Sequence, residues 1–246
     1  MKLLLTIMLA SSPAIAGDSK TIPQDSPALM DIEVGNFEED AEGVYSKLRR
    51  LMFTSREKRQ VWEIGKALTN RDTESAQKAL DTLVREYPEL KKDEPQAIIF
   101  HQATINFWKG DLNGAYEGFN KAIKELEQVF PNGIVPQGHK YWKENTSFMG
   151  KLYFGRGATE LHQRKYAQAI LDIDKAISIS PEPRAYMQFN KCRALLRLNQ
   201  YKEAAEAYTQ AYKIDSTWAV KVEDKVEICA LLVKNGFQPQ PCLPKK

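Results

Sequence analysis

Residue types that bind metals are scarce in this sequence, which has 3 histidines and 3 cysteines among 246 residues. The histidines, His101, His139 and His162, lie far apart, and the cysteines lack the paired spacing of a zinc site. The paired-histidine motif of metalloproteases and the glycine-flanked serine of hydrolases are also absent from the sequence. We therefore expect no metal, no cofactor and no enzyme activity.

Charge of one sign and long apolar runs are missing too. The 35 lysines and arginines are interleaved with 32 aspartates and glutamates, which leaves a net charge of +3 and no dense basic stripe. This pattern excludes a nucleic-acid partner. Beyond the N-terminus no segment is apolar for long enough to cross a membrane, so we expect no stable membrane insertion.

Residues 1–16 have the layout of a cleavable secretory signal. Lys2 is followed by an apolar run over 3–10, and small residues at Ala14 and Ala16 precede Gly17, the expected first residue of the mature protein. This pattern predicts a periplasmic or secreted protein; the alternative is a cytosolic protein with a hydrophobic N-terminus. Residues 17–35, which have two prolines and little periodicity, are expected to form a flexible leader.

Two stretches of the chain spell nearly the same pattern 35 residues apart, from Lys165 to Pro181 and from Gln200 to Ser216. Small and large residues alternate in both at helical spacing. The matching residues are Tyr166, Ala169, Ile173, Ala176 and Ile179 in the first stretch and Tyr201, Ala204, Tyr208, Ala211 and Ile214 in the second. Such a pattern lets two helices interlock, and a repeated two-helix unit stacks on its neighbours to cover its apolar face.

The pattern resembles the tetratricopeptide repeat, a helix-turn-helix unit of about 34 residues. Residues that match the family pattern in order are Gly157, Tyr166, Ala169, Ile173, Ala176 and Pro181. The resemblance implies an all-α, right-handed superhelical α-solenoid of four units, at residues 56–90, 96–129, 149–183 and 185–218. Capping helices are expected at 36–55 and within 219–246, where the last helix is expected to make the end of the array soluble.

An insertion over residues 130–148 separates the second and third units. Prolines and glycines at 131–138 mark a loop, but the segment after it has no helix breaker. We therefore expect both flanking helices to be lengthened and to project as a hairpin. Tyr141 and Trp142 either form a binding arm on this projection or pack the lengthened hairpin.

The first helices of the four units are expected to line the inner wall of the solenoid. The candidate partner-binding residues on their free faces are Phe100, Lys151, Phe154, Tyr186, Phe189, Arg193 and Arg197. Aromatic rings and arginines dominate protein interfaces, and together they suit an extended peptide or a helix with acidic character. The alternative is that the rings fill gaps between neighbouring helix pairs.

A subset of the resembling family grips C-terminal carboxylates with Lys, Asn and Arg on the inner wall. Phenylalanines stand here where that set needs polar groups, so chaperone-tail recognition of that type is not expected.

The cysteines have different expected roles. Cys192 falls at a small, buried position of its unit. Cys229 lies in a predicted helix that ends near Gly236, and the tail that follows is long enough to bring Cys242 back to it. In an oxidising compartment we expect a disulfide between Cys229 and Cys242.

These observations favour an exported protein-protein interaction scaffold that binds a peptide or helix of another protein. A role in assembly or maintenance of the cell envelope is inferred from compartment and family analogy alone. Two alternatives stay open. One is an envelope sugar- or peptide-binding protein, or an enzyme, that uses the groove along the same inner wall. The other is a homo-oligomer that stacks through its end faces.

Overall fold

The computed structural model describes residues 55–93, 95–140, 142–216 and 225–242. Within these ranges the chain forms ten α-helices and two short 3₁₀ segments, and no strand. The predicted all-α class is therefore confirmed. The expected signal, leader and N-terminal capping helix lie outside the described residues.

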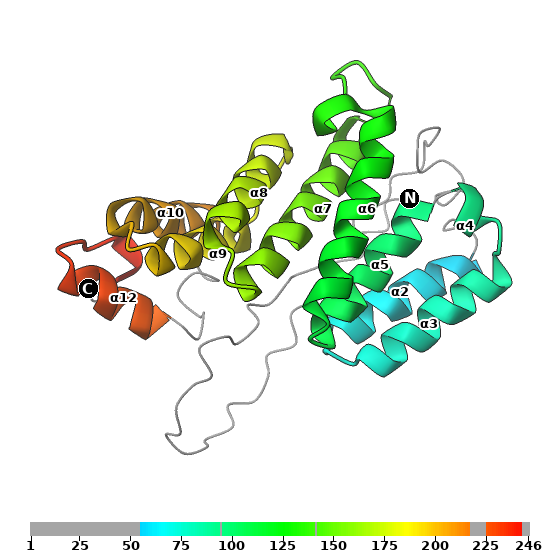
Figure 1. Cartoon of the computed structure of the whole chain (residues 1–246), viewed down its shortest axis with the longest axis horizontal. Coiled ribbons are helices and arrows are strands. Elements are labelled where there is room, and N and C mark those ends of the chain that lie inside the picture. Colours follow the sequence, from blue (N-terminus) through cyan, green and yellow to red (C-terminus); the bar gives the residue numbers. More distant parts are fainter. Residues whose placement is uncertain (1–54, 94, 141, 217–224, 243–246) are drawn as a thin grey trace.

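Eight of the helices form four consecutive pairs, which Figure 1 shows stacked along the molecule. The pairs are α2 (Ser55–Thr69) with α3 (Thr73–Glu86), α5 (Pro95–Trp108) with α6 (Leu112–Val129), α7 (Trp142–His162) with α8 (Tyr166–Ile179), and α9 (Ala185–Arg197) with α10 (Tyr201–Ile214). The short α4 (Leu90–Asp93) follows the first pair, and α12 (Lys225–Lys234) follows the last. Each first helix contacts the next one, α2 with α5, α5 with α7 and α7 with α9, so these helices form a continuous first-helix wall.

All four pairs turn in the same way. The residue before the cap of each second helix has a positive φ: Arg71 at 56°, Gly110 at 81°, Arg164 at 62° and Asn199 at 58°. A left-handed residue at this point lets the next backbone N–H bond back into the first helix, as Asp111 N does to Asn106 O at 2.9 Å. In the first two pairs the carboxylates of Asp72 and Asp111 then cap the second helix.

Small residues set how closely the helices approach. A Cβ atom added to Gly118 would lie 2.7 Å from the Cβ of Ala103, and one added to Gly155 would lie 2.6 Å from the ring of Phe119. A Cβ atom added to Gly157 would lie 3.0 Å from the side chain of Ile173. Because interiors are packed to near-crystal density, a larger side chain at these points has no space without a shift of the helices.

The insertion lengthens the helices on both sides of it, as expected. α6 has 18 residues and α7 has 21, whereas the other paired helices have between 13 and 15. The 3₁₀ segment Pro131–Gly133 follows α6, and Figure 1 shows this hairpin projecting beyond its neighbours. Trp142 is half-buried and packs against the central apolar core. Of the two roles considered for this residue, a binding arm or packing of the hairpin, this position agrees with packing. Tyr141 lies outside the described residues.

Polar side chains join each pair to the next one. Gln77 and Gln102 exchange two amide hydrogen bonds, of 3.0 and 2.9 Å, between α3 and α5. Arg156 Nη1 on α7 donates to Asn120 Oδ1 on α6 at 2.8 Å. Lys191 Nζ on α9 lies 2.6 Å from Asp174 Oδ1 on α8. Each of these polar seams connects a second helix to the first helix of the following pair, so the stacking order has a polar contact at every step.

The seam in the middle of the array contains a buried carboxyl group with a perturbed pKa. Arg156 Nε and Nη2 donate to both carboxylate oxygens of Asp172, at 2.5 and 2.8 Å. Glu160 is 5% exposed, and its Oε2 atom has no hydrogen-bond partner. Burial, followed by the charge of Asp172, raises the pKa of Glu160 to about 7, although Arg156 and Lys165 act in the opposite direction. Glu160 therefore gains a proton on folding below that pH.

Replacing Glu160 by glutamine is expected to stabilise the protein above neutral pH. The pKa of Glu160 is about 7 in the fold against 4.5 ordinarily, so the wild type loses stability as the pH rises through this window, and the glutamine variant does not. The difference in unfolding free energy should widen by about 1–3 kcal/mol between about pH 5 and about pH 8, with the lower figure allowing for solvent screening. Urea unfolding at several pH values measures it.

The matched control for this prediction is Glu117→Gln, which removes an exposed carboxyl group on α6. Its stability should follow that of the wild type at every pH. Parallel pH profiles for the wild type and the Glu160 variant would show that the carboxyl group is not perturbed.

Candidate functional site

The aromatic candidates lie inside the first-helix wall. Phe100, Phe154, Tyr186 and Phe189 are between 2% and 8% exposed. The ring of Phe154 contacts that of Tyr186 at a centroid distance of 4.8 Å, across the contact between α7 and α9. The rings are therefore buried between helices, which agrees with the alternative that they fill gaps between neighbouring helix pairs. Contact between these rings and a partner stays a prediction.

The other two rings are packed in the same manner. Phe100 lies edge-on to Phe119 at 6.0 Å and to Phe148 at 5.3 Å, which joins α5 to α6 and α7. Phe189 lies 5.8 Å from Tyr208 of α10. The rings therefore fill gaps between helices and fix the positions of the polar residues beside them.

The cationic candidates remain at the surface of this wall. Lys151 on α7 and Arg193 on α9 are half-buried, and Arg197 at the end of α9 is exposed. The pKa of His101 on α5 is lowered to about 4. Burial is the larger cause, and the positive charge of Lys151 is the smaller one. His101 is thus neutral near pH 7, and its Nδ1 atom has no hydrogen-bond partner. His101 is 9% exposed and is thus one of the buried polar residues of α5.

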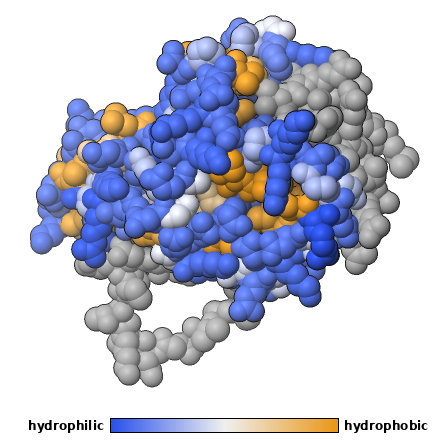
Figure 2. All heavy atoms as spheres, turned by 45° about the vertical axis from the view of Figure 1, so that its right-hand side comes forward, coloured by the Kyte–Doolittle hydropathy of each residue, from blue (hydrophilic) through white to orange (hydrophobic). Residues whose placement is uncertain are grey.

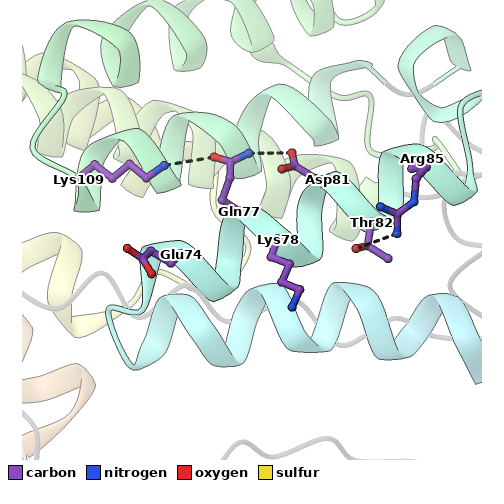
Figure 3. A pocket seen from close by; sticks show the side chains of 7 residues that line it. All are labelled: Glu74, Gln77, Lys78, Asp81, Thr82, Arg85 and Lys109. Carbon is purple, nitrogen blue, oxygen red and sulfur yellow. Dashed lines mark hydrogen bonds between the residues drawn. The ribbon is translucent and has the colours of Figure 1, made fainter.

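A second candidate surface is a polar hollow of about 480 Å³ beside α3, shown in Figure 3. Its lining residues are Glu74, Gln77, Lys78, Asp81, Thr82, Arg85 and Lys109. Lys109 Nζ donates to Gln77 Oε1 at 3.5 Å, and Gln77 Nε2 donates to Asp81 Oδ1 at 3.0 Å. Sequence reasoning missed this hollow, because charged residues spaced four apart on a helix are typical of an ordinary solvated face.

Both surfaces present charged and hydrogen-bonding groups that can bind a ligand. The wall offers ammonium and guanidinium groups over a rigid aromatic layer, and the hollow offers both donors and acceptors. Across the residues that the structure describes, no three histidine, cysteine, aspartate or glutamate side chains are grouped so that they can hold a metal ion. None of the helices described is both long and apolar enough to span a membrane.

Figure 2 shows that the visible face is mostly hydrophilic, with a hydrophobic area gathered near its centre. An apolar area bordered by polar residues is typical of a surface that contacts other molecules.

The structure contains a disulfide between Cys229 and Cys242, with a Cα–Cα distance of 5.2 Å. It joins α12 to the 3₁₀ segment Gln240–Cys242. Cys192 is a free, fully buried cysteine in the core of the last pair, at the small position of its unit.

Two comparisons with known proteins concern this chain. Residues 185–217 match the tetratricopeptide repeat family, and this range includes α9, α10 and the turn between them. The chain is also 29% identical over 111 residues to the Hsp70/Hsp90 co-chaperone CNS1 of Saccharomyces cerevisiae. The matched region covers 45% of this chain and 26% of the yeast protein, so the chain spans about a quarter of that relative's length.

These similarities support the tetratricopeptide family and a protein-protein interaction scaffold. They agree with the stacked helix pairs and with surfaces that offer binding groups. They point toward a role in contact with other proteins.

Removing the disulfide is expected to destabilise the C-terminal end of the array. In the chain-entropy model a disulfide across 13 residues lowers the entropy of the unfolded chain and stabilises the fold by about 3 kcal/mol, so the double variant Cys229→Ser, Cys242→Ser should unfold at lower denaturant. Equilibrium unfolding followed by circular dichroism measures the change. Adding a reductant should lower the midpoint of the wild type and leave the double variant unchanged. A wild type that is insensitive to the reductant would contradict this expectation.

Proposed function

We propose that this chain is an exported scaffold that binds an acidic segment of another protein along its first-helix wall, in assembly or maintenance of the cell envelope. Support for an interaction role comes from the family match, which falls on α9 and α10. The choice of compartment, ligand and surface is argued below from the residues that favour each.

Export is favoured by two separate features. Residues 1–16 have the basic start, apolar run and small residues of a secretory signal. The disulfide between Cys229 and Cys242 is of a kind that forms and persists outside the reducing cytosol. An envelope role is the simplest use of an interaction scaffold in such a compartment, and it rests on analogy.

The observation that carries the choice of ligand is the placement of cations on the wall. Lys151, Arg193 and Arg197 stand on two first helices that contact each other, α7 and α9. The edge-on contact between the rings of Phe154 and Tyr186 holds these two helices in place, so the cations are positioned before a partner arrives. Arginine forks and lysine ammonium groups make charge-assisted hydrogen bonds to carboxylates. An acidic peptide or helix is therefore the partner chemistry that this wall favours.

The yeast relative is named for the chaperones Hsp70 and Hsp90. For this chain we expect a different ligand, because Phe100 and Phe154 are apolar where grips for chaperone tails use polar side chains.

The proposal is tested with an array of peptides of matched length and graded acidity. The wild type should retain the acidic peptides, and raising the salt concentration should weaken binding. The variant Lys151→Glu, Arg197→Glu should lose at least about tenfold in affinity, since it places two negative charges where the ligand is negative. Melting curves check that the variant folds.

The matched control reverses two exposed lysines on the second helix of the last pair, Lys202→Glu with Lys213→Glu. It changes the net charge by the same amount away from the wall. Equal loss of binding in both variants would mean that net charge, and not the wall, attracts the peptides, and would reject the proposed surface.

The polar hollow beside α3 favours a second candidate function, the binding of a small envelope sugar or peptide. A ligand that binds only the folded state raises its melting temperature by mass action. Thermal shifts with cell-wall fragments that are abolished by Lys78→Glu with Arg85→Glu would support this candidate. The absence of any shift at millimolar ligand would remove it.

A further inference from the structure

The last helix described, α12, is apolar on two sides. Its inner side carries Ile228 and Leu232, which are 4% and 0% exposed and pack into the core of the last helix pair. Its outer side carries Val226, Ala230 and Val233. Val226 is 80% exposed, Val233 is 44% exposed, and Ala230 is also exposed.

The three outer residues form one stripe along the helix, because their spacings of four and three residues bring them to the same face. Among the exposed large hydrophobic residues of the described chain, Val226 has the highest exposed fraction. An apolar face of a helix is normally covered by another element. The outer face of α12 is thus not the polar face expected of a solubilising cap, and it is a surface on which another element can dock.

We propose that a second copy of this chain occupies this stripe, with the two α12 helices packed antiparallel about a two-fold axis near Ala230. A small residue at the centre of a stripe lets two helix backbones approach closely. In an antiparallel pair Val226 of each copy then faces Val233 of the other. The same patch serves both partners, as a two-fold interface requires.

The charges beside the stripe match this arrangement. Glu227 and Lys234 follow Val226 and Val233 by one residue each, so they lie along the same edge of the stripe, seven residues apart. In a two-fold antiparallel pair this edge faces itself in reverse, which brings each Glu227 toward Lys234 of the other copy. A two-fold parallel pair would instead place this edge on opposite sides of the interface, so Glu227 and Lys234 would not meet across it. Charge complementarity therefore favours a second copy in the antiparallel orientation.

The disulfide contributes to this surface by holding its helix. Cys229 lies on α12 between the inner and outer residues, and its bond to Cys242 ties the helix to the tail that follows. One helix per partner buries a small area, so the pair should be reversible, with a dissociation constant in the micromolar range. Each pair carries two first-helix walls, and two linked walls can raise the avidity for a partner with repeated segments.

Sedimentation velocity of the full chain, with its disulfide formed, tests the proposal over about 1 to about 200 µM protein. The wild type should pass from monomer to dimer within this range. Val226→Lys should raise the dimer dissociation constant at least about tenfold, because it places an ammonium group against the apolar Val233 side chain of the other copy. The matched control is Leu171→Lys, which alters a leucine that is 70% exposed on α8 and should leave the association unchanged.

Charge reversal tests the antiparallel geometry. Glu227→Lys and Lys234→Glu should each weaken the dimer by roughly three- to tenfold, and the double variant should recover the affinity of the wild type. A wild type that stays monomeric throughout overturns the proposal and leaves another segment of the chain or a different protein as the occupant. A dimer that tolerates Val226→Lys overturns it as well. So does a Glu227→Lys, Lys234→Glu double variant whose loss of dimer affinity is the sum of the two single losses.

Discussion

The fold depends on how closely neighbouring helices can approach. At Gly118 and Gly155 the next helix or its side chain occupies the space in which a Cβ atom would stand. Close packing at these points brings the two helices of a pair together and sets one pair directly on the next. The four turns, each with a left-handed residue before the second helix, return the chain to this contact. The continuous wall of first helices is a consequence of that repeated approach.

Close packing brings the helix pairs together, and polar side chains specify the order in which the pairs stack. Gln77 with Gln102, Asn120 with Arg156 and Asp174 with Lys191 join successive pairs by different chemistry at each step. A buried ring layer and a polar seam thus lie on opposite sides of the same helices. Within the part of the chain that the structure describes, the candidate surfaces for partners are the cationic side of the wall, the polar hollow beside α3 and the outer face of α12.

The sequence predicts the helices well because their signals are local. The repeated stretch from Lys165 to Pro181 predicts a helix, and α8 runs from Tyr166 to Ile179. The exposure of the wall residues is a different matter, since it depends on how far the next pair overlaps the one before. A phenylalanine three residues before a small residue can face solvent or the next helix, and only the stacking decides. The polar seams also join residues 25, 36 and 17 positions apart, for which a single sequence carries no pairing signal.

Unfolding of glycine-to-alanine variants tests the central claim most directly. Gly118→Ala and Gly155→Ala should each lower the free energy of unfolding, because overpacking costs about 1–3 kcal/mol and outweighs the gain of about 1 kcal/mol in helix propensity. Gly138→Ala adds a methyl group where no atom lies within 4 Å, and it should leave the stability within about 0.5 kcal/mol of the wild type. Stabilisation by about 1 kcal/mol at both Gly118 and Gly155 would show that helix propensity alone decides there, and would contradict the close approach on which this account rests.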